Sequence, residues 1–80
     1  MADELIFPRP FVLRRGEDVS GVSGTGDVAE GVVFGDGTVA LRWRSETAST
    51  VLWSSLVDAL TVHGHDGRTT VVFADEEAAA

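Results

Sequence analysis

Two histidines and an aspartate near the C-terminal end are the residues whose types and spacing could do chemistry. His63 and His65 stand two positions apart in the string HGHDG, and Asp66 follows directly. On a strand both imidazoles would point to one side, and with Asp66 they would offer three ligands and an open position to zinc or manganese. Asp66 is better explained as the start of an Asp-Gly turn, and the chain has no cysteine and no other histidine. We therefore expect no cofactor, with metal-dependent hydrolysis as an alternative function.

The same histidines could instead contact an anionic ligand together with Arg68. The stretch of residues 16–26, GEDVSGVSGTG, offers consecutive amides and hydroxyl groups that suit phosphate. It lacks the GxxxxGK[ST] pattern and precedes a predicted strand, so a tight loop across the mouth of a barrel is the competing interpretation. The predicted ligand-binding residues are Arg14, Ser20, Ser23, Thr25, His63, His65 and Arg68.

Two further arginines are candidates for contact with a partner. Arg42 and Arg44 are predicted to stand opposite Gly31 and Ala29 on the outer face of a hairpin. Guanidinium groups above such a shallow floor could hold an anion. The competing interpretation is that both are solvated strand residues.

A central hairpin must position these arginines. Asp36-Gly37 separates two apolar runs within residues 26–44, which predicts a two-residue type I′ turn with Phe34 opposite Val39. Glu30 then falls on the apolar face, where a rim position would let its carboxylate reach water. The predicted core face of this hairpin consists of Val28, Val32, Phe34, Val39, Leu41 and Trp43.

The remaining segments add short strands. Residues 11–15 (FVLRR) and 50–53 (TVLW) are strand candidates, and residues 59–73 predict a second hairpin around Asp66-Gly67 with Val62 opposite Val71. Residues 55–60 predict one helical turn. The fold class is therefore all-β, an SH3-like barrel of about five to six short strands with at most one helical turn.

Length and composition bound the domain and its partners. The 80 residues predict one small domain over residues 11–74, after an extended tether (1–10) and before an acidic disordered tail (75–80). A net charge of −7 argues against non-specific nucleic-acid binding. No apolar run could span a membrane and no leader pattern opens the chain, so we expect a cytoplasmic protein. So small a core favours a homodimer.

Two blocks of sequence resemble a known set of proteins. DVSGVSGTG followed by VAEG, and HGHDGRT further on, are similar to small uncharacterised proteins of actinobacteria, haloarchaea and actinobacterial phages. The resemblance covers about residues 11–73. It implies a phage or mobile-element accessory protein and supplies no activity.

No nucleophile, base and acid stand at a spacing that predicts catalysis, so we do not expect an enzyme. The function we predict is a non-catalytic binding module that binds and inhibits a host protein. The first alternative is a binder or sequesterer of an anionic small molecule such as a nucleotide, and the second is the metal-dependent hydrolase.

Overall fold

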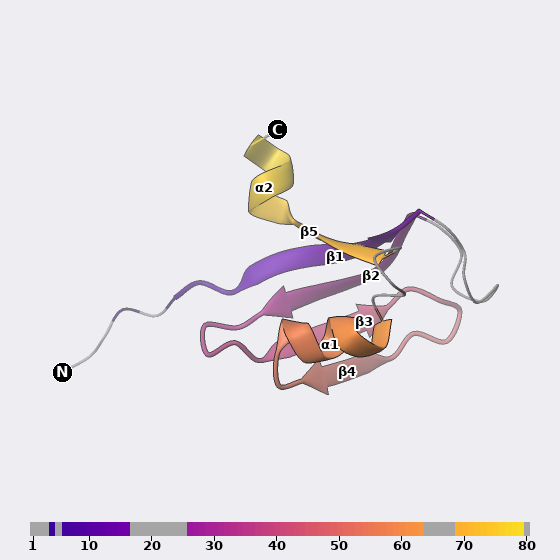
Figure 1. The fold of residues 1–80 in the computed structure, drawn as a ribbon, viewed down its shortest axis with the longest axis horizontal. Coiled ribbons are helices and arrows are strands. Elements are labelled where there is room, and N and C mark those ends of the chain that lie inside the picture. The colour runs from indigo at the N-terminus through magenta and orange to yellow at the C-terminus, as the bar shows by residue number, and fades with distance from the viewer. Residues whose placement is uncertain (1–3, 5, 17–25, 64–68, 80) are drawn as a thin grey trace.

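The chain forms one five-stranded antiparallel sheet with two short helices (Figure 1). The structure, a computed structural model, describes residues 4, 6–16, 26–63 and 69–79. The strands lie in the order β4-β3-β2-β1-β5, so the first and last strands are neighbours. The elements are β1 (Arg9–Arg15), β2 (Gly26–Val33), β3 (Val39–Trp43), β4 (Thr50–Trp53), α1 (Leu56–His63), β5 (Thr69–Phe73) and α2 (Ala74–Ala79).

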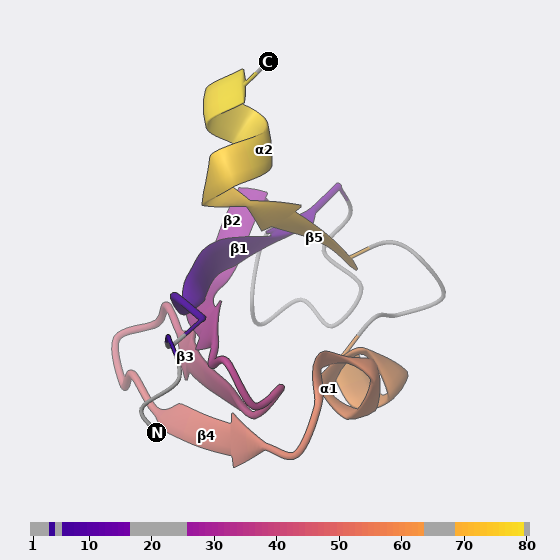
Figure 2. The ribbon, with the colours of Figure 1, turned by 90° about the vertical axis from the view of Figure 1, so that its left-hand side faces the viewer.

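The sheet is strongly bent, with α1 beside β4 on its concave side and α2 beyond β5 (Figure 2). Strands β1 to β4 form a meander, and β1 also pairs with β5 along its other edge. This is a small barrel-like arrangement. The prediction of a small, mostly-β barrel is therefore confirmed. Helices of eight and six residues exceed the single helical turn that the sequence predicted.

The core lies on the concave face, here called the inner face. Cα partners in the ladders share a face, so Leu13, Ala29 and Trp43 form one row across three strands. From α1, Leu56, Ala59 and Leu60 close this core, at the spacing of one helical stripe. The buried side chains of the sheet are Phe11, Leu13, Val28, Ala29, Val39 and Leu41.

The turn between β2 and β3 is one residue longer than predicted. The Phe34 amide donates to the Thr38 carbonyl at 2.8 Å, and the Gly37 amide donates to the Phe34 carbonyl at 2.9 Å. Gly37 has φ +90°, the left-handed conformation that closes a three-residue loop with a bulge. Val33 therefore pairs with Val39 in place of Phe34.

This one-residue shift turns β2 over relative to the prediction, because side chains alternate between the faces. Gly31 lies on the inner face opposite Leu41, and Phe34 is exposed in the turn. Glu30 lies on the outer face opposite Arg42, not opposite Trp43. The predicted floor of Gly31 and Ala29 beneath the two arginines is therefore wrong.

Helix α1 replaces the first strand of the predicted second hairpin. The Ser55 hydroxyl accepts a hydrogen bond from the Asp58 amide at 3.1 Å, as an N-cap does, and the helix continues to His63. Val62 is exposed on α1, whereas Val71 pairs with Leu13 of β1. The pairing of Val62 with Val71 is therefore wrong, and the Asp66-Gly67 turn lies outside the described residues.

The C-terminal segment is helical where the sequence predicted a disordered tail. The Arg9 guanidinium binds both carboxylate oxygens of Asp75, at 3.2 and 3.1 Å. It also lies 3.8 Å from the ring centroid of Phe73, a cation–π contact. Arg9 opens β1, so the predicted tether is already strand at this position and joins α2 to the sheet.

The Arg9–Asp75 contact makes a pH-dependent attachment of α2. Hydrogen bonding from Arg9 lowers the pKa of Asp75 below its usual value of 3.8. A group whose pKa is lower folded than unfolded stabilises the fold above the unfolded pKa, and this contribution is lost as the pH falls through the folded pKa. We expect the pKa of the Asp75 carboxyl, followed by NMR, to lie below its usual value in the native protein and to be higher in Arg9→Gln than in the native protein.

Asp36 is the internal control for this titration. Its pKa is also lowered, by a hydrogen bond from Thr38, and Arg9 takes no part in that contact. Its titration should not move in Arg9→Gln. An Asp75 titration that is the same in both proteins would contradict the assignment.

Candidate functional site

The outer face of the sheet carries an open groove of about 790 Å³. Alternation along β1 sends Phe11 and Leu13 into the core and leaves Pro10 and Val12 on the outer face. Both faces of this strand are therefore apolar, but only one is covered by the core. The apolar lining of the groove consists of Pro10, Phe11, Val12, Gly31, Val32, Ala40, Val72 and Ala74. Its polar lining consists of Arg14, Asp27, Glu30, Arg42, Thr50 and Glu77.

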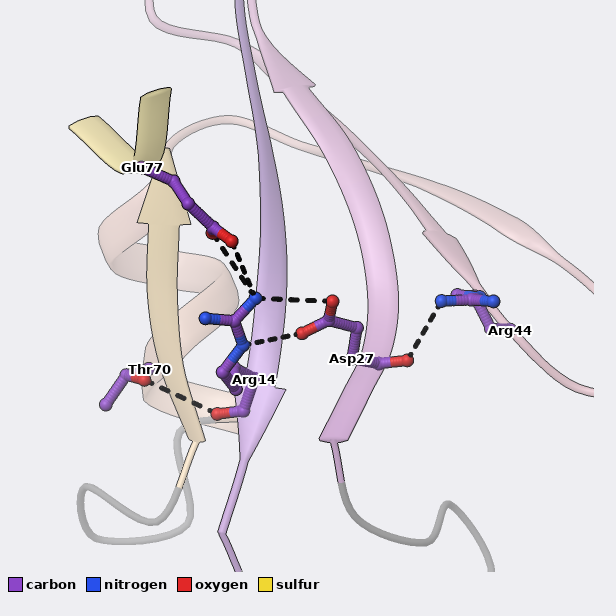
Figure 3. Close-up of polar contacts among 5 residues, drawn as sticks. All are labelled: Arg14, Asp27, Arg44, Thr70 and Glu77. Atoms are coloured by element: carbon purple, nitrogen blue, oxygen red, sulfur yellow. Dashed lines mark hydrogen bonds and ion pairs between the residues drawn. The ribbon is translucent and has the colours of Figure 1, made fainter. Parts of the chain in front are cut away.

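Arg14 lies at one end of the groove and is paired with two carboxylates (Figure 3). Its Nε donates to Asp27 Oδ1 at 2.7 Å, and its Nη2 lies 3.3 Å from Glu77 Oε2. The hydrogen bond that Arg14 donates to Asp27 lowers the pKa of Asp27 and raises the pKa of Arg14. Arg14 was predicted to bind an anionic ligand, but its guanidinium already has carboxylate partners from β2 and α2.

Arg42 lies on β3 further along the groove. Its positive charge is less neutralised by neighbouring groups than that of Arg14. Its Nη1 donates to the hydroxyl of Thr50 at 2.9 Å. Across the described ranges, no ion pair joins Arg42 to a carboxylate, although Glu30 is its Cα partner on β2. Its guanidinium is therefore suited to meet a carboxylate from another molecule.

Arg44, the second predicted partner-binding residue, does not line the groove. Its Nη1 lies 3.5 Å from the backbone carbonyl oxygen of Asp27 (Figure 3). The two arginines are thus close in sequence and similarly exposed, but only Arg42 belongs to the groove.

His63 lies at the end of α1 on the other side of the sheet. Its ring packs edge-on against Trp43 and Trp53, with centroid separations of 4.7 and 5.6 Å. The Trp43 row is on the inner face, so His63 and Arg14 are not brought together into one site. The other predicted ligand residues, Ser20, Ser23, Thr25, His65 and Arg68, lie outside the described residues.

A metal centre finds no support in the part of the chain that the structure describes. Within it, no three His, Cys, Asp or Glu side chains are grouped so that they could hold a metal ion. Asp66 and His65, which would complete the proposed centre with His63, lie outside that part.

A protein-family model described as Acb5 phage protein matches residues 8–75. The chain belongs to this family. The match spans all five strands and α1, so the groove is built almost wholly from residues that the Acb5 model covers. A search of curated proteins and a search of solved structures each give no match.

Among the described residues of this Acb5 family member, no helix is long and apolar enough to cross a membrane.

Sequence reasoning missed one buried polar residue, Arg15. It ends β1 on the inner face, is 2 % exposed, and its Nε donates to the Thr69 hydroxyl at 2.9 Å. The signal was present in FVLRR, because alternation from Phe11 and Leu13 places position 15 on the core side. The arginine predicted to bind a ligand was instead Arg14, its neighbour on the outer face.

Proposed function

We propose that this phage accessory protein is a non-catalytic binding module whose outer-face groove binds and inhibits a host protein. The observation that carries the proposal is a groove floored by half-buried apolar side chains beside Arg42, whose bonded partner in the described structure is a neutral hydroxyl. A mostly apolar groove with a few polar groups at its margin is typical of a binding site. A homodimer and a metal-dependent hydrolase are not needed to explain it.

The floor of the groove indicates how the partner would bind. The strands β1, β2 and β3 beneath it are paired on both sides, so their backbone groups are already used within the sheet. The partner must therefore bind through side chains. We propose a host segment that sets apolar side chains on Val12, Val32 and Val72 and a carboxylate against Arg42.

A photoactivatable cross-linking residue would identify the occupant. Placed at Thr50, which lines the groove, it should join the protein to one host protein in infected actinobacterial cells, the hosts that the sequence resemblance suggests. The same residue placed at Thr61, exposed on α1, is the control and should not form this adduct.

Affinity for the identified host protein then separates the two arginines. Arg42→Glu should weaken binding at least tenfold, because it places a negative charge against the partner carboxylate. Arg44→Glu makes the same charge change outside the groove and should stay within twofold of the native protein. Equal losses in both variants, or a Thr50 cross-link to a second copy of this chain, would overturn the proposal.

A further inference from the structure

The two adjacent arginines of β1 have opposite environments. Arg14 is 43 % exposed and has carboxylate partners in Asp27 and Glu77. Arg15 is 2 % exposed, and its Nε donates to the neutral hydroxyl of Thr69. Its Nη1 is buried and has no hydrogen-bond partner in the part of the chain that the structure describes. Among the described residues, the exposed arginine has carboxylate partners and the buried one has none.

This arrangement is costly unless an anion accompanies Arg15. Guanidinium stays protonated at all physiological pH values, so Arg15 cannot lose its charge on burial. A buried charge without a counter-charge strongly destabilises a fold. Within the described residues, no carboxylate lies at ion-pair distance from Arg15.

Arg15 and Thr69 together offer donors for an oxyanion. The two residues are Cα partners at the end of the sheet where β1 finishes and β5 begins. Because the Thr69 hydroxyl accepts from Arg15 Nε, its own proton is still available to donate. The unpaired Nη1–H of Arg15 supplies a second, charged donor beside it.

We propose that Arg15 and Thr69 form a buried binding site for a phosphate group, either free phosphate or the phosphate of a small ester such as a nucleotide. The site lies on the inner face, on the opposite side of the sheet from the groove, and it does not depend on the function proposed for that groove. A phosphate there would supply the negative charge that Arg15 lacks.

Isothermal titration calorimetry on the full chain tests the site, after unfolding and refolding to remove any carried ligand. The probes are inorganic phosphate and adenosine monophosphate, each at low salt. We expect at least one to bind, with affinity that falls as salt is added. Tighter binding of adenosine monophosphate than of inorganic phosphate would indicate that the natural ligand is a larger phosphate ester. Equal binding of the two would indicate that it is free phosphate.

Variants tie the binding to these two residues. Arg15→Lys keeps a charge but loses the planar fork, and it should weaken binding at least tenfold. Arg14→Gln removes the neighbouring guanidinium on the outer face and should stay within twofold of the native protein. If Arg15→Lys fails to fold, Thr69→Val should lose binding and Thr69→Ser, which keeps the hydroxyl, should retain it.

The alternative source of a counter-charge for Arg15 is an acidic side chain of this protein, and a separate variant tests it. The proposal is overturned if neither probe binds the native protein. It is also overturned if Arg14→Gln loses binding as fully as Arg15→Lys. A further variant, Glu17→Gln/Asp18→Asn/Asp66→Asn, removes the acidic residues that stand within three sequence positions of Arg15 or Thr69. Loss of stability in that variant, together with no phosphate binding, would assign the counter-charge to one of these carboxylates.

Discussion

Leu41→Ala should lower the free energy of unfolding by about 3 kcal/mol, as is typical of a leucine truncated at a fully buried site. Leu41 is 0 % exposed at the centre of the sheet, between Gly31 of β2 and Val51 of β4. Removing its side chain leaves a cavity that paired backbones on both sides cannot close. Urea denaturation followed by tryptophan fluorescence measures the loss.

Leu52 provides the matched control for this truncation. It lies on the adjacent strand β4 and is 73 % exposed. Leu52→Ala should change the free energy of unfolding by less than about 0.5 kcal/mol, as surface substitutions usually do. Equal losses in the two variants would show that Leu41 is not in the core.

The second large effect is expected at Gly31, where a single methyl group has no room. A Cβ at this position would lie 2.6 Å from the backbone oxygen of Ala40 and 2.6 Å from Cζ of Phe11. The backbone contact cannot be relieved by a side-chain rotation, so β2 or β3 must shift. We expect Gly31→Ala to lower the free energy of unfolding by about 2 kcal/mol, the range of overpacked cores.

Gly16→Ala is the control for Gly31→Ala. A Cβ at Gly16 would meet no atom within 4 Å, and its φ does not require glycine. Its stability should equal or slightly exceed that of the native protein, because alanine restricts the unfolded chain. A Gly31→Ala protein as stable as Gly16→Ala would contradict the close approach of Phe11.

The sequence predicted the faces of β3 but not those of β2, and the reason is the length of the turn between them. Phe34-Gly35-Asp36-Gly37 suits a two-residue turn on Asp36-Gly37 and equally a three-residue loop that ends in a left-handed Gly37. The Asp-Gly pair between two apolar runs favoured the first. The contact that distinguishes them, Phe11 over Gly31, joins strands whose pairing the local sequence does not reveal.

The sequence predicted only the first turn of helix α1, because the apolar positions of this segment satisfy two periods at once. Leu60 and Val62 alternate as on a strand, whereas Leu56, Ala59 and Leu60 follow a helix. In a segment of eight residues neither pattern dominates. The packing of the helical stripe on the inner face decides the outcome.

For the candidate site, the sequence indicated which residues could take part in binding, but not which residues they contact in the fold. Arg42 was predicted to meet a partner, and it does line a groove. The pairing of Arg14 with Glu77 joins residues 63 positions apart, which only the tertiary structure brings together. The position of Arg15 on the core side follows from simple alternation with Phe11 and Leu13.

The pairing of β5 with β1 has a consequence for the order in which the molecule can fold. The contact between Arg15 and Thr69 spans 54 positions, and Leu13 of β1 reaches its partner Val71 near the end of the chain. During synthesis β1 is made first but can pair only with β2 until the last strand leaves the ribosome. Closing so long a loop is entropically costly, and contacts of this separation are associated with slow folding. The second edge of β1 and the guanidinium of Arg15 are therefore exposed to water until β5 has been made and has paired with β1.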